Sequence, residues 1–327
     1  TFPPIPQRGS LTTVEVSGLF VYLTPSSRYY WGDVETVAYT APVSPNPMIK
    51  STLGGEAASF TATAITNLIE LDAATTTLIA VGRYTDAPTD TLKALINRTI
   101  VDLKADGVFA KADCMYIRGV HESLLACQNW IKNAHNSTLV NNPTFTPKEG
   151  IQGNGTTSYI NDNFTPSTQG VNFLIGATTF VFMDKIIGTG NQTIPYGCQK
   201  ADSNPCFFMW FNTGINDDAS HSVTPGNNTL NVAANKFIGF TNKNVGGNKI
   251  YAYLDGVEDV TPKAITLQLT LPNYNFYELV MNSQEQSVLH YNGQRSFSFI
   301  GGVLTEAQHL ALYTRVKYFF DNVASTF

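Results

Sequence analysis

Two short segments of the sequence combine aromatic and amide side chains in a pattern that suits sugar binding. Trp210 and Asn212 lie in FFMWFN, and Tyr274, Asn275 and Tyr277 lie in PNYNFYE. Aromatic rings pack on the apolar C–H faces of sugars, and amide groups hydrogen-bond to sugar hydroxyls. We therefore treat these residues as candidate glycan-binding residues, and the alternative is that the rings pack in a core or an interface.

The residues for nucleophilic catalysis are not arranged in a recognisable motif. No Gly-x-Ser-x-Gly segment occurs, and the histidines are scattered at His121, His135, His221, His290 and His309. His121 precedes Cys127 by six residues, but a single pair of this kind arises easily by chance. The sequence therefore predicts no nucleophilic active site.

The cysteines do not have the spacing of a metal site. Cys114, Cys127, Cys198 and Cys206 include no C-x-x-C pair, whereas structural zinc needs closely paired ligands. Cys198 and Cys206 flank QKADSNP, a turn-rich loop. A disulfide that closes a hairpin and a set of buried free thiols both remain open for them.

Calcium is the other metal that the acidic residues suggest. Asp162, Asp217 and Asp218 are possible ligands, but no D-x-D-x-D-G loop is present. We predict neither a metal nor a cofactor.

The glycine-rich segment EGIQGNGTTSYIND poses a choice between a phosphate site and a turn. Gly150 and Gly155 have the spacing of a phosphate-binding loop, but Thr156 stands where its Lys would be. The residues that follow are β-branched, hydroxylated and aromatic, which favours a strand over a helix. We therefore expect a tight turn into a strand over Thr156–Ile160, with no phosphate bound.

The composition excludes several classes of partner. Charged residues make up 14% of the chain, and the net charge of −5 comes with scattered lysines. No basic stripe is present, so neither nucleic acid nor an anionic membrane is expected as a partner. No run of about 18 apolar residues occurs, so no membrane insertion is expected. The N-terminus, TFPPIPQRG, shows no secretory signal.

Most of the chain is predicted to be β structure. Leu11–Thr40 alternates in strand fashion, and Ser59–Tyr84 is rich in β-branched residues, so we favour strands in both. From Asp113 onward, short apolar segments alternate with Asn, Gly, Pro and Ser turns, as in a sandwich. The Asp255-Gly256 pair predicts a two-residue type I′ hairpin turn.

Two helices are predicted at the ends of this β region. In Pro88–Gly107 one face is apolar, with Leu92, Leu95, Ile96, Ile100 and Leu103 three or four residues apart. Near the C-terminus, Thr305 and Gln308 form a capping box. The apolar stripe predicted for the helix that follows contains Leu310, Tyr313, Val316 and Phe320.

The segments FTPKEGIQGNGTTSYI, KFIGF, IYAYLDGV and SFSFIGGVLTEAQ follow one another in an order that resembles the concanavalin A-like, laminin-G-like jelly roll. With a helix and the link KADCMYIRG upstream, the chain resembles such domains in bacteriophage fibre and virion surface proteins. The resemblance covers residues 88–327. It implies a mainly β jelly-roll sandwich with an upstream helix, a C-terminal helix and a small N-terminal β region.

The resemblance also defines what an enzyme of this kind would need. Glycanases of the concanavalin A-like class carry catalytic carboxylates on one strand as E-x-D-x-E or E-x-D-x-x-E. The nearest match is Glu70-Leu71-Asp72, but Ala74 and Thr75 stand where the second Glu is required. We therefore expect no catalytic residues.

These observations lead to a domain plan and a functional hypothesis. We predict an N-terminal β region at 1–87 for virion attachment or oligomerisation, a connecting helix and linker at 88–112, and a sandwich at 113–327. The resemblance implies a non-enzymatic virion surface component, made in the host cytoplasm. Its expected partners are other virion proteins, further copies of the chain, with a trimer as the first expectation, and host cell-surface polysaccharide. A polysaccharide depolymerase and a host-secreted adhesin are the alternatives.

Overall fold

The computed structural model describes residues 11–17, 20–25, 35–39, 60–65, 71–80, 87–188, 196–199, 206–210, 214–216, 234–244, 247–258, 262–264 and 270–323. Only the backbone is described for the strands at 11–65, 206–210, 214–216 and 263–264. None of the helices in these ranges is both long and apolar enough to cross a membrane.

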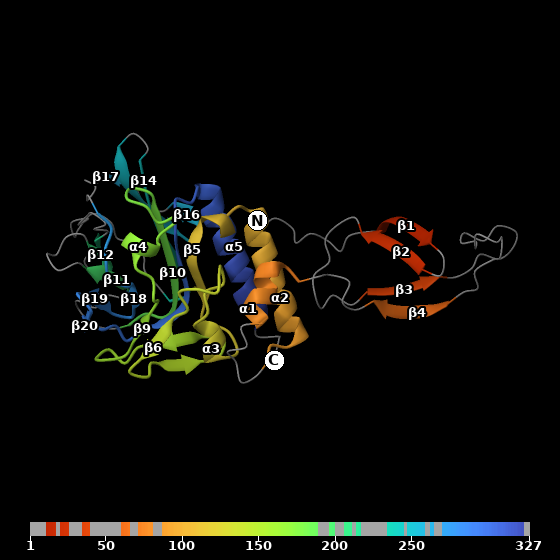
Figure 1. The fold of residues 1–327 in the computed structure, drawn as a ribbon, viewed down its shortest axis with the longest axis horizontal. Coiled ribbons are helices and arrows are strands. Elements are labelled where there is room, and N and C mark those ends of the chain that lie inside the picture. The colour runs from red at the N-terminus through yellow and green to blue at the C-terminus, as the bar shows by residue number, and fades with distance from the viewer. Residues whose placement is uncertain are drawn as a thin grey trace, which may run out of the picture. The chain divides into compact units, whose positions relative to one another are not determined.

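The N-terminal region contains two antiparallel strand pairs (Figure 1). Strand β1 (Leu11–Ser17) pairs with β2 (Phe20–Pro25), and β3 (Glu35–Tyr39) pairs with β4 (Phe60–Ile65). The predicted small β region is therefore confirmed.

The strand prediction for Ser59–Tyr84 is correct at β4 and wrong at residues 73–80, which form a helix. Helix α1 spans Ala73–Ala80. Asp72 begins it, because its Oδ1 accepts a hydrogen bond from the backbone N–H two residues later, at 2.9 Å. Thr75 and Leu78 are buried, so packing against the rest of the fold outweighs the β propensity of the threonines.

Helix α2 (Asp90–Ala105) confirms the helix predicted over Pro88–Gly107. All members of its predicted apolar face are buried: Leu92, Leu95, Ile96, Ile100 and Leu103. Gly107, with φ of 71°, follows the helix in the left-handed conformation that commonly ends helices.

The other described strands form a β-sandwich of two sheets (Figure 1). The nine-stranded sheet consists of β5 (Ala112–Ile117), β7 (Thr144–Thr146), β8 (Gly150–Gln152), β10 (Thr178–Ile186), β14 (Phe237–Asn244), β15 (Asn248–Leu254), β16 (Val257–Glu258), β17 (Lys263–Ala264) and β21 (Gln294–Gly301). Its order is β16-β15-β14-β10-β21-β8-β7, with β17 on β15 and β5 on β21.

The eight-stranded sheet consists of β6 (Thr138–Val140), β9 (Tyr159–Asn161), β11 (Tyr196–Gln199), β12 (Cys206–Trp210), β13 (Gly214–Asn216), β18 (Tyr277–Glu278), β19 (Met281–Ser283) and β20 (Gln286–Val288). Its order is β13-β12-β11-β18-β9-β6, with β19 on β11 and β20 on β19. Short helical turns lie in the connections, at η1 (Phe109–Lys111), α3 (Ser123–Ala126) and α4 (Pro166–Gln169). The predicted fold class, a mainly β sandwich with helices before and after it, is confirmed.

The Asp255-Gly256 hairpin is present between β15 and β16. Both residues have positive φ, 52° and 81°, as a type I′ turn requires. A Cβ on Gly256 would lie 2.7 Å from the Cα of Leu310, so the turn also permits close approach of the C-terminal helix.

That helix, α5 (Glu306–Val323), begins with the predicted capping box. Gln308 N–H donates to Thr305 Oγ1 at 3.2 Å, and Thr305 N–H donates to Gln308 Oε1 at 3.0 Å. The predicted apolar stripe is correct at Val316, which is buried, and wrong at Leu310, which is 47% exposed. The buried residues of α5 are His309, Leu312, Val316, Phe319 and Val323. His309 is therefore buried at the start of α5, where the hydrophobic pattern predicted that Leu310 would be buried instead.

Candidate functional site

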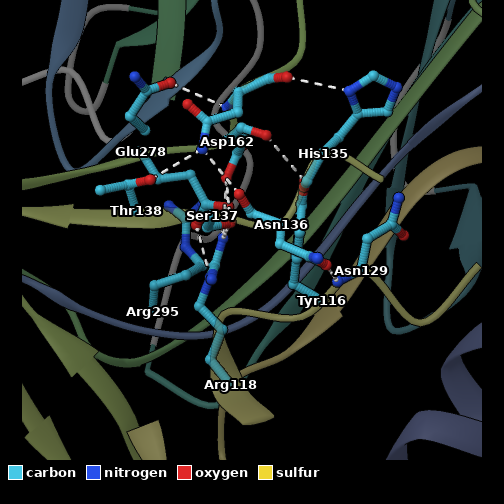
Figure 2. A network of polar contacts seen from close by, with 12 residues as sticks. Tyr116, Arg118, Asn129, His135, Asn136, Ser137, Thr138, Asp162, Glu278 and Arg295 are labelled. Carbon is cyan, nitrogen blue, oxygen red and sulfur yellow. Dashed lines mark hydrogen bonds and ion pairs between the residues drawn. The ribbon is translucent and has the colours of Figure 1, made fainter. Parts of the chain in front are cut away.

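A fully buried ion-pair network joins the two sheets (Figure 2). Arg118 directly follows β5 of the nine-stranded sheet, whereas Glu278 lies in β18 and Asp162 directly follows β9 in the other sheet. Arg118 Nη2 donates to Glu278 Oε1, and at 2.9 Å to Asp162 Oδ1. All these side chains are 0% exposed. The network therefore fixes one sheet against the other across the core.

A second arginine extends this network along the nine-stranded sheet. Arg295 Nη1 donates to Glu278 Oε2 at 3.3 Å, and Arg295 Nε donates to Asp184 Oδ1 at 2.5 Å. Tyr291 OH donates to Asp184 Oδ2 at 3.1 Å. Removing one partner of such a pair leaves an uncompensated buried charge, which is strongly destabilising.

The two carboxyl groups around Arg118 differ in protonation. Burial, together with the charge of Glu278, raises the pKa of Asp162 well above its ordinary value. Burial alone would raise the pKa of Glu278, but Arg118 and Arg295 outweigh it and hold that pKa below its ordinary value. Asp162 is therefore the more easily protonated member of the pair, and Glu278 the more strongly ionised one. Because neither carboxyl group reaches solvent, this pair is not placed to act on a substrate.

The network supports a loop at residues 127–138 on the surface side. Arg118 Nη1 donates to the carbonyl of Ala126 at 3.0 Å, and Arg118 Nη2 donates to Ser137 Oγ at 3.2 Å. Ser137 Oγ in turn donates to Asp162 Oδ1 at 3.0 Å, and Ser137 N–H donates to the carbonyl of Cys127 at 2.7 Å. Both ends of the loop are thus held by the buried charges.

Asn129 organises the middle of this loop. Its Oδ1 accepts from the N–H of Met115 at 3.1 Å, and its Nδ2 donates to the carbonyl of Ala134 at 3.0 Å. Its own N–H donates to Asn136 Oδ1 at 2.9 Å. Figure 2 shows Asn129 and Asn136 at the edge of the same polar network. These hydrogen bonds therefore tie the middle of the loop to β5 and to the far end of the loop.

Two pockets border this loop, and both are lined by Gln128 and Asn136. The first has a volume of about 320 Å³ and is lined by Ala73, Ala74, Thr77, Leu78, Gln128, Asn129, Trp130, Ile131, Lys132, Asn133 and Asn136. The second has a volume of about 260 Å³ and is lined by Ser123, Leu124, Cys127, Gln128, Asn136, Ser137, Thr138 and Leu139. We call the first one the Gln128 pocket.

The Gln128 pocket is bordered by polar groups that have no partner within the described part of the chain. Gln128 is 2% exposed and Trp130 is 1% exposed. Neither the amide nitrogen nor the amide oxygen of Gln128 is hydrogen-bonded, and the indole N–H of Trp130 is not either. Buried polar groups are almost always paired, so these atoms stand out as polar groups to which no described residue supplies a partner.

Those glycan-binding candidates whose side chains the structure describes lie outside this pocket. Tyr277 is buried, with its ring 4.6 Å from that of Tyr159. Tyr274 is half-buried, and Asn275 Oδ1 accepts from Thr165 Oγ1 at 2.6 Å.

Trp210 ends β12, which belongs to the same sheet as β18, but its side chain and all of Asn212 lie outside the described residues. The assignment of this set to glycan binding stays a prediction. The Gln128 pocket was missed, although the same signal, an aromatic residue beside amides, is present in CQNWIKN.

Other sequence candidates are accounted for by local structure. Burial raises the pKa of the Cys127 thiol to about 11, so this thiol is protonated at neutral pH and is no nucleophile. Asp72 is ion-paired with Lys104 at 2.6 Å, and Glu70 lies outside the described residues. Asp162 is committed to the buried network.

The remaining metal and disulfide candidates fall largely outside the described residues. Asp217 and Asp218 lie there, as does the side chain of Cys206. Within the ranges given above, no three His, Cys, Asp or Glu side chains gather as a metal site. The β11–β12 register places Cys206 opposite Gln199, one residue beyond Cys198, and the disulfide stays a prediction.

The glycine-rich segment forms a loop closed by its own asparagine. Asn154 Oδ1 accepts from the N–H groups of Thr156, Thr157 and Ser158, at 2.9, 2.8 and 2.9 Å. The N–H groups that could cradle an anion are thus already bound. The strand predicted over Thr156–Ile160 begins only at Tyr159, because these N–H groups are taken from the sheet ladder. Gly150 permits close packing, since a Cβ there would lie 2.0 Å from the carbonyl oxygen of Arg295.

No protein-family model and no curated protein matches this sequence. Among solved structures, domain 4 of the extracellular GH43 arabinanase AbnA from Geobacillus stearothermophilus is similar at 14% identity and a TM-score of 0.36, over 62% of this chain and 98% of that one. The binding domain of botulinum neurotoxin serotype G is similar at 15% identity and a TM-score of 0.42, over 62% of this chain and 50% of that one.

A Trypanosoma rangeli sialidase mutant that displays trans-sialidase activity is similar at 12% identity and a TM-score of 0.42, over 68% of this chain and 40% of that one. The chain thus spans half or less of the toxin and sialidase structures. Similarity at these identities and TM-scores carries no conclusion about function.

Proposed function

We propose that this chain is a non-enzymatic glycan-binding component of a bacteriophage particle surface, and that the Gln128 pocket binds an N-acetylated sugar. The observation that supports the binding role is the set of unpaired polar atoms on Gln128 and Trp130. The pocket volume of about 320 Å³ is comparable to small-molecule sites, which have volumes of roughly 300–1,000 Å³.

The chemistry of an acetamido group matches these atoms. The polar atoms of Gln128 and Trp130 are buried in this structure, so in this proposal both side chains turn towards the pocket when the sugar binds. The acetamido carbonyl oxygen then accepts a hydrogen bond from the indole N–H of Trp130 or the amide N–H of Gln128, and the acetamido N–H donates to Gln128 Oε1. Ala73, Ala74 and Leu78 supply an apolar wall for the acetyl methyl group and for sugar C–H faces. A hydroxyl in place of the acetamido group also donates and accepts, but it lacks the methyl group that packs on this wall and is therefore expected to bind more weakly.

The absence of catalysis is supported by the state of the buried acidic residues. Asp162, Asp184 and Glu278 are fully buried and ion-paired with arginines. Glycoside hydrolysis requires two carboxyl groups that flank the scissile bond. A depolymerase would need such a pair at an accessible surface.

The assignment to a particle surface is supported by the resemblance to virion domains. The low charged fraction of 14% is common in extracellular and particle-surface β proteins. In this proposal the N-terminal β region attaches the chain to other virion proteins or to further copies, with a trimer as the first expectation. Locating the chain in intact particles by immunolabelling and electron microscopy tests this part. Labelling confined to unassembled protein argues for a host-secreted adhesin.

The binding role is tested by calorimetry with a matched pair of sugars. Tri-N-acetylchitotriose and cellotriose differ in acetamido against hydroxyl at each ring, and we expect the former to bind more tightly. Gln128→Met removes the amide at similar volume, and Trp130→Phe removes the indole N–H together with part of the ring system, so both weaken binding. Equal binding of the two sugars, or unchanged affinity in both variants, contradicts the assignment of the site. Release of reducing ends from any polysaccharide supports the depolymerase instead.

A further inference from the structure

A separate pocket of about 460 Å³ lies beside α5 and shares no lining residue with the two pockets at the 127–138 loop. Its walls come from β10, the residues before β14, the β15–β16 turn, β21 and α5. The lining residues are Lys148, Met183, Lys185, Ala234, Asn235, Lys236, Phe237, Asp255, Ser296, Tyr313, Lys317, Phe320 and Asp321. We call it the lysine pocket.

The lysine pocket carries the opposite charge to the protein as a whole. Four lysines face two aspartates in its lining, an excess of two positive charges, whereas the chain has a net charge of −5. Positive charge gathered in one concave site of an acidic protein attracts anions selectively.

The distribution of ion pairs singles out Lys185 within this lining. Lys236 Nζ lies 2.5 Å from Asp255 Oδ2, and Lys317 Nζ lies 2.6 Å from Asp321 Oδ2, so both aspartates are neutralised locally. Lys185 is exposed and forms no ion pair with any described acidic residue. Its ammonium group can therefore pair with an incoming anion without breaking an ion pair to any residue that the structure describes.

The rest of the lining is suited to a ring with both apolar and polar edges. Phe237 and Tyr313 have ring centroids 5.8 Å apart and form an aromatic wall together with Phe320. Asn235 and the phenol of Tyr313 add groups that bind hydroxyls. Inorganic phosphate would use the lysines but not the aromatic wall, whereas a sugar acid would use both.

We propose that the lysine pocket binds a carboxylate-bearing sugar, a uronic acid unit of an acidic polysaccharide, with Lys185 as the principal partner of the carboxylate. That the anion belongs to a carbohydrate rests on the proposed function, whereas the preference for an anion rests on the lysines alone. The site is partly open to solvent, so its affinity decreases as ionic strength increases.

The test compares three probes by isothermal titration calorimetry on the full chain. Trigalacturonic acid binds, its fully methyl-esterified form, which lacks the charges, does not, and inorganic phosphate binds more weakly than the acid. Lys185→Met weakens trigalacturonate binding by about fivefold, the effect of losing one exposed charge pair. Lys185→Arg keeps the charge and retains most of the affinity. Thermal melting of each variant confirms that it is folded.

The other outcomes overturn the proposal in distinguishable ways. Equal binding of trigalacturonic acid and its methyl ester would show that charge does not contribute to binding. Binding of phosphate without binding of trigalacturonate retains an anion site but rejects the sugar acid. No binding of either anion rejects the site altogether. Gln128→Met serves as the control, because it weakens tri-N-acetylchitotriose binding and leaves trigalacturonate binding unchanged, so failure of one site is separable from failure of the other.

Discussion

His309 Nε2 lies 2.6 Å from Thr241 Oγ1, and this contact connects α5 to β14 in the interior of the protein. The imidazole ring also stacks on Tyr253, with ring centroids 3.7 Å apart and an interplanar angle of 12°. Thr241 Oγ1 is also hydrogen-bonded to Thr179 Oγ1, at 2.8 Å. Thr179 Oγ1 in turn accepts a hydrogen bond from the N–H of Leu304, at 3.0 Å. A buried polar relay thus positions the start of the C-terminal helix on the sheet.

This relay makes stability depend on pH in a defined direction. Burial, with a smaller contribution from the charge of Lys243, lowers the pKa of His309 from its ordinary 6.5 to about 3. The unfolded chain therefore takes up a proton below about pH 6.5 that the folded protein excludes. The contribution is complete above that pH and is lost as the pH decreases towards 3, by up to about 1.4 kcal/mol per pH unit.

Urea unfolding of the wild type and of His309→Gln at pH 8, 6, 5 and 4 checks this expectation. The variant is less stable at pH 8, because it loses the ring stack. Its decrease in stability between pH 6 and pH 4 is shallower than that of the wild type, since other titrating groups are common to both proteins. Parallel pH profiles would show that His309 is not the group responsible.

The protonation states around Arg118 predict opposite outcomes for two similar substitutions. Asp162 is the more easily protonated of the two carboxyl groups, so Asp162→Asn removes less negative charge and is expected to cost less than about 1 kcal/mol. Glu278→Gln removes the anion shared by Arg118 and Arg295 and costs about 3–5 kcal/mol, because two buried cations lose compensation. Chemical denaturation of both variants at pH 7 measures the difference. Equal costs, or the reverse order, would mean that Asp162 is the ionised member.

The parts of the fold that were predictable are those encoded by local pattern. The Asp255-Gly256 turn, the Thr305–Gln308 capping box and the apolar face of α2 each depend on residues a few positions apart. Helix α1 was missed because its threonines favour strands, and its helical state depends on burial of Thr75 and Leu78.

The candidate sites were harder to predict, because they bring together residues that are far apart in the sequence. Arg118 and Glu278 are separated by 160 positions, so no local pattern indicates that they meet. The lysine pocket likewise collects residues between Lys148 and Asp321. By contrast, Gln128 and Trp130 were visible as an aromatic residue beside an amide, and only their lack of partners in the folded chain distinguishes them from other such pairs.

Gln128→Met is expected to leave folding intact. In the folded protein the Gln128 amide is buried without hydrogen bonds, so replacing it by a thioether of similar volume removes a desolvation cost. The free energy of unfolding stays within about 1 kcal/mol of the wild type or increases. Differential scanning calorimetry in the absence of sugar measures it. A loss of several kcal/mol would show that the amide is satisfied within the native protein, and would remove the main support for the pocket as a binding site.

Gly256→Val is expected to destabilise the sandwich for two separable reasons. A β-branched residue is strained at a φ of 81°, and its Cβ would lie 2.7 Å from the Cα of Leu310 in α5. Gly247→Ala provides the matched control, because Gly247 also has positive φ, 107°, but a Cβ there meets nothing within 4 Å. We expect the control to cost about 1 kcal/mol and Gly256→Val clearly more, since the helix must also move. Urea unfolding of both variants measures these costs. If the two variants lose the same stability, the turn does not depend on close approach of α5, and an unchanged Gly256→Val would remove the hairpin assignment itself.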